Sequence, residues 1–582
     1  MSLAPIDSWG YPDLRNERYI YQSEDQLVIA LDFGTTFSGI AYSFVKGGKP
    51  DLVPILDWPG REGRKQPKIP TAINYDSGHA DGFSWGSQKH KNEPVRGIKL
   101  LLDTDQKMPI YLPASSAKEA LSRLGKPAVD VAGDFIGAMY RHAMSRIEGA
   151  IPVEYLEMCQ KQFVLSVPAV WSDKAKDLTM KAAKQAGLHP VTLIKEPEAA
   201  AMYTLHYLKD RALIVGDAFV TCDAGGGTVD LISYEIIQLH PKLELKELVP
   251  GTGAGGMAGS LGLNRRFEEA VKKLVGEGQF TNMRNTRAFS AAVNYFDQSV
   301  KTAFRGLKDE DYLVNFPMAK LEDDPKNNLV ADLEAIFNPL IADIEKLVDD
   351  QVKLVINKRT LEEHPRAAEI KAIFLVGGFG SSEYLKSRLS TRHPNIQVIQ
   401  PHDAWSAIVK GAVLSQFPST ATIVSTQATR HYGVSAHSEY DEDRDRGRPK
   451  SLDVYGVMRT ARMTWYIRRG EDLKRTERLR FSFYRTLDDG FDNDDLIFHD
   501  ELRQCESDEA PIHPGPMVKV NCVLKADLTS ADRSSFKKKV GMNGATYWDV
   551  KYDLVVTMMP AMMKFSLEVK GKEMGSVTAK YD

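Results

Sequence analysis

The sequence predicts a duplicated α/β fold followed by a β-rich C-terminal domain, and three observations lead to this prediction. Apolar strand and helix signals alternate from about residue 27 to residue 417, as is typical of an α/β fold. Within that stretch, three pairs of segments recur in the same order about 200 residues apart, which indicates an internal repeat. Beyond about residue 430 the apolar residues follow a period of two, which indicates half-buried antiparallel strands.

The composition excludes several classes of protein. The chain has 582 residues with 75 Lys+Arg, 78 Asp+Glu and a net charge of −3, so it lacks the basic character of a nucleic-acid-binding protein. No apolar run approaches the roughly 18 residues that a membrane span requires, and the first residues lack the pattern of a secretory signal. The four cysteines form no C-x-x-C pair. We therefore expect a cytoplasmic protein with neither nucleic acid nor membrane as a partner.

These signals predict a division of the chain into an N-terminal arm, two lobes, a linker and a C-terminal β domain. The expected bounds are 1–26 for the arm, 27–210 for lobe I, 398–417 for a segment completing lobe I, 211–397 for lobe II, 418–430 for the linker and 431–582 for the β domain.

The repeat is clearest in two predicted hairpins. Leu27–Phe44 (LVIALDFGTTFSGIAYSF) and Phe219–Ile236 (FVTCDAGGGTVDLISYEI) each contain an apolar strand, an Asp, a tight Gly/Thr turn and a second apolar strand. Two further pairs follow in the same order, FVLSVPAV with IFLVGGFG and EPEAAAMYTL with DAWSAIVKGAVL. We therefore expect two copies of one α/β unit that meet across a cleft.

The two hairpin turns have residue types that suit phosphate binding. Glycines let the backbone approach a ligand, successive N–H groups form a concavity for phosphate oxygens, and Thr hydroxyls add donors. The Asp before each turn, Asp32 and Asp223, is suited to hold a hydrated Mg²⁺ ion. The simpler interpretation is two ordinary β-turns, but the duplication with paired Asp favours phosphate. The turns are not Walker-type loops, because no G-x-x-x-x-G-K-[ST] precedes a helix.

A third glycine turn, VGGFGSS, lies between a predicted strand and a predicted helix. Gly377 and Gly378 in this turn would let a nucleoside pack flat against the backbone, although a plain strand-to-helix turn explains them equally well.

These motifs resemble those of a known family. ALDFGTTFSGIAY, TCDAGGGTVDL, KEPEAAAMY and FLVGGFGSS are similar to the two phosphate motifs, the first connecting motif and the adenosine motif of the actin-like ATPase superfamily. Within it, the chain most resembles the 70-kDa heat-shock protein family, in particular the divergent class with an atypical C-terminal region. The resemblance covers about residues 27–417 and implies ATP and Mg²⁺ as cofactors.

The resemblance also implies roles for individual residues. Asp32 and Asp223 would bind Mg²⁺ through water, Glu196 would position the metal shell or the attacking water, and Lys99 would stabilise the transferred phosphoryl group. A helix-start carboxylate and a strand-edge lysine remain the alternatives for Glu196 and Lys99. The residues expected to contact the nucleotide are Gly34, Thr35, Thr36, Gly225, Gly226, Gly227, Thr228, Gly255, Gly256, Lys301, Gly377, Gly378 and Ser381.

Two of these positions carry a further interpretation. Lys301 lies four residues after Asp297 on a predicted helix, where an ordinary ion pair is the simpler explanation. Ser381 stands where the family usually has an arginine that stacks on the base, so the adenosine motif departs from the family pattern there. The tail matches no motif of the family.

Three functions are compatible with this sequence. The first is a chaperone-like ATP hydrolase in which Mg-ATP, clamped between two lobes, gates the β domain; an unfolded or extended polypeptide, or a partner protein, is then the expected partner of that domain. The second is a nucleotide-gated scaffold with little hydrolysis. The third is a small-molecule kinase of the sugar-kinase type, for which the sequence offers no distinct catalytic base.

Overall fold

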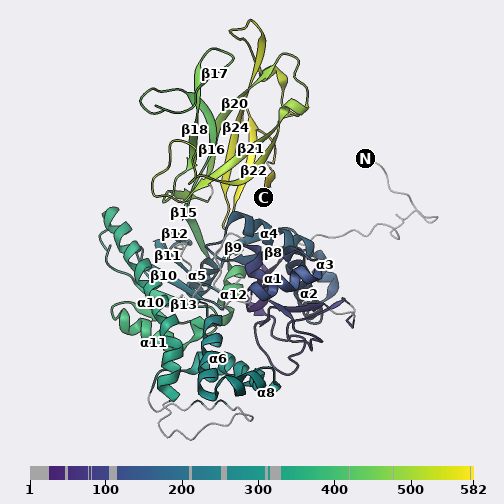
Figure 1. Ribbon diagram of the computed structural model, residues 1–582, viewed down its shortest axis with the longest axis vertical. Coiled ribbons are helices and arrows are strands. Elements are labelled where there is room, and N and C mark those ends of the chain that lie inside the picture. The colour runs from purple at the N-terminus through teal and green to yellow at the C-terminus, as the bar shows by residue number, and fades with distance from the viewer. Residues whose placement is uncertain are drawn as a thin grey trace, which may run out of the picture.

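The computed structural model describes residues 25–45, 50–75, 78–79, 81–103, 114–208, 213–250, 259–307, 312, 314, 329–417, 420–475, 477–576 and 578–581. Two α/β lobes lie side by side, and a β-rich region is stacked on one end of them (Figure 1). The predicted fold class, an α/β part followed by a β-rich C-terminal region, is confirmed.

The sheet of lobe I has the strand order β3-β2-β1-β8-β9, with the short β4 beside β2. β2 runs antiparallel to β1, whereas β8 and β9 run parallel. The strands are β1 (Gln26–Asp32), β2 (Phe37–Val45), β3 (Val53–Pro54), β4 (Ile69–Pro70), β8 (Gln160–Val167) and β9 (Val191–Lys195).

Both faces of this sheet are covered, which explains why β1 is almost continuously apolar. Leu27, Ile29 and Leu31 on one face join a core with residues of α2 and α4, whereas Val28 and Ala30 on the other face join a core with α5 and α12. Around lobe I lie the three-stranded sheet β5 (Ala72–Tyr75), β6 (Phe83–Trp85) and β7 (Val95–Arg96), and the helices η1 (Ile98–Leu102), α1 (Ala114–Leu124), α2 (Ala128–Glu148), α3 (Val153–Met158), α4 (Asp173–Gln185) and α5 (Glu196–Tyr207).

The sheet of lobe II repeats this topology. Its order β12-β11-β10-β13-β14 matches β3-β2-β1-β8-β9 strand for strand, with the same parallel and antiparallel pairings. The predicted duplication is thus present in the fold itself. The strands are β10 (Ala218–Ala224), β11 (Val229–Gln238), β12 (Leu243–Val249), β13 (Ala372–Val376) and β14 (Gln397–Ile399).

Lobe II carries more helices than lobe I, and they share one apolar core with its sheet. Its long helix α10 spans Leu329–Leu361 and packs against β10, β11 and β12. The others are α6 (Leu261–Val275), α7 (Glu277–Met283), α8 (Arg287–Tyr295), η2 (Phe296–Val300), α9 (Lys301–Ala303), η3 (Phe379–Ser381) and α11 (Glu383–Arg392).

Two small-residue helices cross between the lobes. α5 follows β9, and α12 (Ala407–Leu414), preceded by η4 (Ala404–Ser406), follows β14 at the equivalent point of the second copy. They pack closely because Gly411 of α12 lies directly against the backbone of Ala199 in α5 and leaves no room for a Cβ atom. α12 also contacts β1, β2 and β8, so this late segment of the chain packs on the sheet of lobe I.

The β-rich region is a sandwich of two sheets that share one core. One has the order β17-β18-β16-β21-β22-β27, and the other has the order β20-β24-β25-β26 with β23 beside β24. The strands of the first are β16 (His431–Glu439), β17 (Ser451–Leu452), β18 (Met458–Ile467), β21 (Ile497–Cys505), β22 (Lys519–Asp527) and β27 (Thr578–Lys580). Those of the second are β20 (Arg478–Asp488), β23 (Lys537–Val540), β24 (Thr546–Met558), β25 (Met563–Val569) and β26 (Lys572–Ser576), and the short helices η5 (Asp494–Leu496) and η6 (Arg533–Ser535) lie between strands.

The β-rich region is joined to lobe II through backbone hydrogen bonds. β15 (Ala421–Gln427), which lies inside the segment expected as a linker, pairs parallel with β12, and β19 (Asp472–Lys474) pairs antiparallel with β15. Both strands therefore extend the sheet of lobe II to seven strands. This pairing has no clear signal in the sequence, because ATIVSTQ has the polar composition of a linker as much as that of a strand.

Candidate nucleotide site

The two predicted phosphate turns meet. The turn at Gly34–Thr36 connects β1 to β2, and the turn at Gly225–Thr228 connects β10 to β11. They abut so closely that a Cβ atom on Gly227 would lie 2.9 Å from Thr35 Oγ1, and one on Gly226 would lie 3.0 Å from Thr36 Cβ. Backbone N–H groups and Thr hydroxyls from both lobes are thus gathered at one place.

The turn of lobe I is held in place by hydrogen bonds from Thr71 and Ser38, neither of which was predicted to belong to the site. Thr71 donates from Oγ1 to the carbonyl of Gly34 over 2.8 Å and from its backbone N–H to the carbonyl of Thr36 over 2.8 Å. The Ser38 hydroxyl accepts from Gly34 N–H and lies 2.7 Å from the Thr71 hydroxyl. These contacts fix the backbone of the turn without using its own side chains.

The turn of lobe II is held by contacts within itself and from α6. Gly225 N–H donates to Thr228 O over 2.9 Å, and Thr228 Oγ1 donates to Asp230 Oδ2 over 2.8 Å. Leu261 N–H, at the start of α6, donates to Gly226 O over 3.0 Å. Asp230 occupies the β11 position that pairs with Asp223 on β10, so the turn lies between two carboxylates.

Asp32 is fully compensated by its neighbours. It is 2% exposed, its Oδ2 accepts from Lys68 Nζ at 2.5 Å, and its Oδ1 accepts from Ser166 Oγ at 2.8 Å. Burial by itself raises the pKa of Asp32, but the ammonium groups of Lys68 and Lys99 outweigh it, so the pKa lies below its ordinary value.

Asp223 has the opposite environment. It is 4% exposed, and its Oδ1 finds no hydrogen-bond partner within the described part of the chain. Burial, together with the Glu196 and Asp230 carboxylates, raises the pKa of Asp223 well above its ordinary value. Gly377, at φ +87°, passes so close to this carboxylate that a Cβ atom there would collide with it. A buried carboxylate in this state requires either a proton or a cation.

Glu196 and Lys99 form a buried ion pair between the start of α5 and η1. Lys99 is 3% exposed, and its ammonium lies 5.4 Å from the centre of the Trp171 ring. Burial raises the pKa of Glu196 to about 7, because nearby Asp32 and Asp230 add to the effect and Lys99 only partly offsets it. The structure therefore brings Asp32, Asp223, Glu196 and Lys99 into one electrostatically linked group, and Lys99 is a buried partner of Glu196.

The residues predicted to contact the nucleoside are less completely defined. Gly377 and Gly378 follow β13, Trp405 Nε1 lies 3.8 Å from the position of a Cβ on Gly378, and Ser381 ends η3. Lys301 is 4% exposed and donates to Asp297 Oδ1 at 2.6 Å and to the Ser260 carbonyl at 2.8 Å, so the ion pair expected as its simpler explanation is present. Gly255 and Gly256 lie outside the described residues.

Four contributors to the site, Lys68, Thr71, Ser166 and Asp230, were not named from the sequence. Asp230 lies inside the TCDAGGGTVDL motif, so its position two residues after Thr228 was an available signal. Lys68, Thr71 and Ser166 reach the site from separate segments, and no spacing in the sequence links them to Asp32.

The donor set fits a hydrated divalent cation. In the described ranges, no group of three or more His, Cys, Asp or Glu side chains has the arrangement of a direct metal centre. The unpartnered oxygen of Asp223 beside further carboxylates is nevertheless the kind of oxygen-only environment that Mg²⁺ occupies while keeping its waters.

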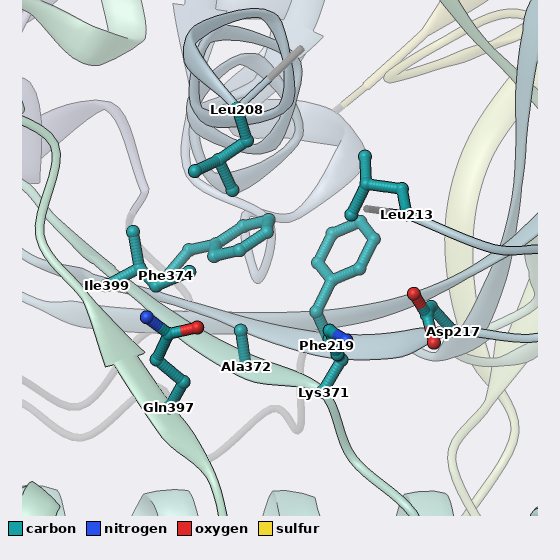
Figure 2. Close-up of a pocket in the computed structure, with 9 residues that line it drawn as sticks. All are labelled: Leu208, Leu213, Asp217, Phe219, Lys371, Ala372, Phe374, Gln397 and Ile399. Atoms are coloured by element: carbon teal, nitrogen blue, oxygen red, sulfur yellow. The ribbon is translucent and has the colours of Figure 1, made fainter. Parts of the chain in front are cut away.

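An apolar cavity lies elsewhere in lobe II. It measures about 200 Å³ and lies where β10 and β13 begin, whereas Asp223 lies near the end of β10. Figure 2 shows the ring of Phe374 below Leu208 and the ring of Phe219 below Leu213, and the two rings stack with centroids 4.5 Å apart. The lining is mainly apolar, so this cavity does not have the chemistry of a phosphate site. Separately, no helix among the described residues is long and apolar enough to cross a membrane.

A duplicated α/β unit whose two Asp-bearing hairpins meet turn to turn defines an ATPase domain of the actin-like class. The family model for the Hsp70 protein matches residues 136–416. The matched part of the chain is that of a divergent Hsp70-family member.

Its relatives agree with this assignment. Heat shock 70 kDa protein 12A of Homo sapiens is 26% identical over 520 residues, covering 72% of this chain and 73% of the relative. Heat shock 70 kDa protein 12B of Homo sapiens is 26% identical over 511 residues, covering 71% and 72%. The chaperone protein HscA of Pectobacterium carotovorum is 28% identical over 225 residues, covering 35% of this chain and 32% of that protein.

Proposed function

We propose that this protein is an ATP-binding and ATP-hydrolysing chaperone-like protein, in which Mg-ATP is clamped between the lobes and controls the C-terminal β domain. The single observation that supports it most is the meeting of the two turns, each with a buried Asp on the preceding strand. The family assignment and the similarity to a chaperone protein agree with it.

The residues present suit phosphoryl transfer to water. Backbone N–H groups and Thr hydroxyls of both turns would bind the phosphate oxygens, so that catalysis consists of positioning and charge stabilisation. When bound, Mg²⁺ supplies charge neutralisation at the phosphates. Glu196 would orient the attacking water and accept its proton at a carboxylate oxygen, and Lys99 would stabilise charge on the phosphoryl group. Both must first leave their mutual ion pair, and this requirement favours slow hydrolysis.

Control of the β domain is supported by its contacts with the helix that begins at Glu196. Arg475, which follows β19, donates to both carboxylate oxygens of Glu198 at 2.7 and 2.6 Å. Both side chains are largely buried, at 13% and 2% exposure. A displacement of α5 at the nucleotide site would therefore act directly on a residue of the β-rich region.

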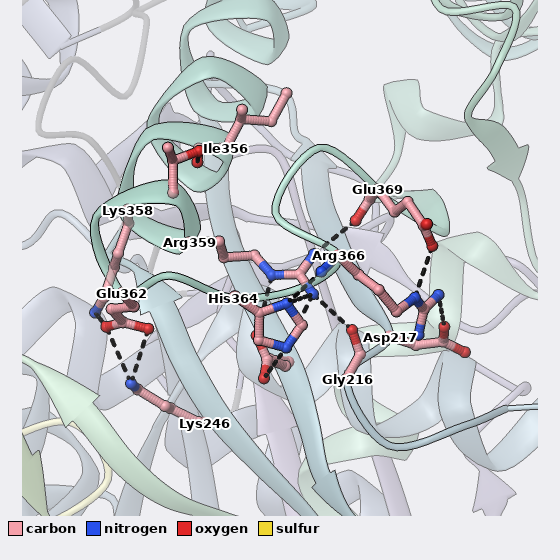
Figure 3. Close-up of polar contacts among 12 residues, drawn as sticks. Gly216, Asp217, Lys246, Ile356, Lys358, Arg359, Glu362, His364, Arg366 and Glu369 are labelled. Carbon is pink, nitrogen blue, oxygen red and sulfur yellow. Dashed lines mark hydrogen bonds and ion pairs between the residues drawn. The ribbon is translucent and has the colours of Figure 1, made fainter.

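Further contacts tie the β-rich region to both lobes. Tyr432 and Asn521 each donate to Asp173 Oδ2 at the start of α4, at 3.0 and 2.9 Å. On lobe II, Asp472 of β19 lies 3.0 Å from Lys246 and 3.2 Å from Lys358, and Figure 3 shows the same two lysines reaching Glu362 near the end of α10. We propose that an extended polypeptide or a partner protein binds the β domain, and that the protein acts in the cytoplasm, where its four free cysteines stay reduced.

ATP binding and turnover by the full chain test the proposal directly. We expect ATP binding that Mg²⁺ strengthens and slow phosphate release that requires Mg²⁺. Asp223→Asn should remove the effect of Mg²⁺ on binding and abolish the release. Tight binding without measurable turnover would favour the nucleotide-gated scaffold, and transfer to a sugar hydroxyl would favour the kinase. No binding at all would refute the proposal.

The control of the β domain is tested at Arg475. We expect ATP to change the protease sensitivity of the β domain in the wild type, and Arg475→Met and Glu198→Gln to remove that change with little effect on ATP affinity. Arg444→Met, at an exposed arginine of the same domain, is the matched control. An ATP response that survives both variants would contradict the control mechanism alone.

A further inference from the structure

Lys68 reaches the nucleotide site by a route built into the sheet. It precedes β4, which pairs with β2, and its side chain crosses β2 at Gly39, where a Cβ atom would lie 3.1 Å from Lys68 Cγ. Gly39 is the β2 residue that pairs with Asp32 on β1. The glycine therefore provides the passage through which the ammonium reaches Asp32.

The Lys68 ammonium is buried and forms an ion pair with Asp32. Lys68 is 5% exposed and Asp32 is 2% exposed, with 2.5 Å between Nζ and Oδ2. Three residues further on, Thr71 holds the backbone of the phosphate turn. The segment that carries Lys68 thus also supports the turn, and the ammonium lies at the strand end from which the turn begins.

The buried charges of the site show what the Lys68 ammonium contributes. Among the residues that the structure describes, four buried carboxylates, Asp32, Asp223, Glu196 and Asp230, lie with two buried ammonium groups, Lys68 and Lys99. A polyphosphate entering without a metal ion would be repelled by those of the four carboxylates that are ionised, and this repulsion is strong because the site is shielded from water. Without Lys68, the Asp32 carboxylate would add a further uncompensated charge beside the first turn.

We propose that Lys68 is a nucleotide-positioning residue that supplies, from the protein itself, part of the positive charge usually contributed by Mg²⁺, so that ATP still binds when Mg²⁺ is scarce. This inference rests on the proposed function and names a feature of the same site. It predicts that Mg²⁺ changes the affinity for ATP less in this protein than in a site where neither aspartate has an ammonium partner.

The test is a calorimetric titration of the full chain with ATP, in excess Mg²⁺ and in EDTA. Wild type should bind in both, and Lys68→Met should weaken binding in EDTA by about tenfold more than in Mg²⁺, the size of one lost charge-assisted hydrogen bond. Lys68→Arg should restore most of the EDTA affinity. Lys65→Met is the matched control, because it removes the same charge from an exposed position three residues away.

A metal titration without nucleotide gives a second readout. In Lys68→Met the freed Asp32 should bind Mn²⁺ more tightly than in wild type, as measured by electron paramagnetic resonance. If Lys68→Met fails to fold, Lys68→Gln, which keeps a hydrogen-bond donor for Asp32, takes its place. Equal losses with and without Mg²⁺, or the same change in Lys65→Met, would overturn the role of Lys68 alone. An absence of ATP binding by wild type even in Mg²⁺ would overturn the proposed function together with it.

Discussion

The two phosphate turns come from the same structural unit, yet their aspartates have opposite environments. Asp32 in lobe I is paired with Lys68 and Ser166, and its pKa is lowered. Asp223 in lobe II has an oxygen without a hydrogen-bond partner in the described part of the chain, lies among other carboxylates, and has a raised pKa. The two copies share the same backbone arrangement. Side chains from other segments neutralise Asp32, whereas Asp223 still requires a proton or a cation.

The largest expected effect concerns the stability of the ligand-free protein. Asp32→Asn leaves the Lys68 ammonium buried without its anion, so the free energy of unfolding should fall by about 3–5 kcal/mol. Asp223→Asn removes a buried carboxylate whose Oδ1 has no hydrogen-bond partner among the described residues, so stability should stay the same or rise. Urea denaturation in EDTA measures both, and equal losses in the two variants would show that the two turns are electrostatically alike.

The second effect is a dependence of stability on pH. Because the pKa of Glu196 is raised to about 7 in the folded protein, from 4.5 when unfolded, its contribution is fully present below pH 4.5 and is lost as the pH rises to 7. The loss from Glu196 is at most about 3 kcal/mol, and Glu196→Gln should reduce the slope in the nucleotide-free protein in EDTA, while the raised pKa of Asp223 supplies the slope that remains. Asp32 acts in the opposite direction, because its lowered pKa makes its contribution disappear only as the pH falls below about 3.8. Thermal melts across this range measure both slopes, and a flat profile in wild type would contradict the assigned environment of Glu196.

The third effect compares how the two turns are supported. Thr71→Val removes the side-chain hydrogen bond to Gly34 O and should cost about 1–2 kcal/mol of stability, with weaker ATP binding as a consequence. Thr228→Val in the other turn removes the bond to Asp230 but leaves the bond from Gly225 N–H to Thr228 O. We therefore expect the backbone of the second turn to tolerate its substitution better. Denaturation and ATP titration of the two variants side by side measure this, and a larger loss in Thr228→Val would reverse the comparison.

The smallest effect is expected at Ser166. Ser166→Ala removes one hydrogen bond to Asp32 while Lys68 remains, so the loss should be about 1 kcal/mol. Denaturation under the same conditions as for Asp32→Asn measures it, and a loss as large as that of Asp32→Asn would mean that Ser166, and not Lys68, is the main partner of Asp32.

Features that follow from a repeated local pattern could be predicted from the sequence. The period of apolar residues and the paired Asp-Gly-Thr turns predicted the two sheets and the residues that meet between them. The sequence was insufficient where a residue acts across the fold, as Lys68 does through the gap at Gly39 and Arg475 does at Glu198, because no spacing along the chain encodes those contacts. The strand character of β15 was also missed, since its partner β12 lies far away in the sequence.

Because β15 pairs with β12, the β domain is attached to lobe II more firmly than to lobe I. A movement of the β domain relative to lobe II must break the backbone hydrogen bonds of a continuous sheet. The β domain contacts lobe I, in contrast, through the side chains of Tyr432, Asn521 and Arg475 and through Ala561, which packs into the core of lobe I. In the proposed nucleotide cycle, lobe II and the β domain should therefore move together, and the contacts that break and form again should be those with lobe I.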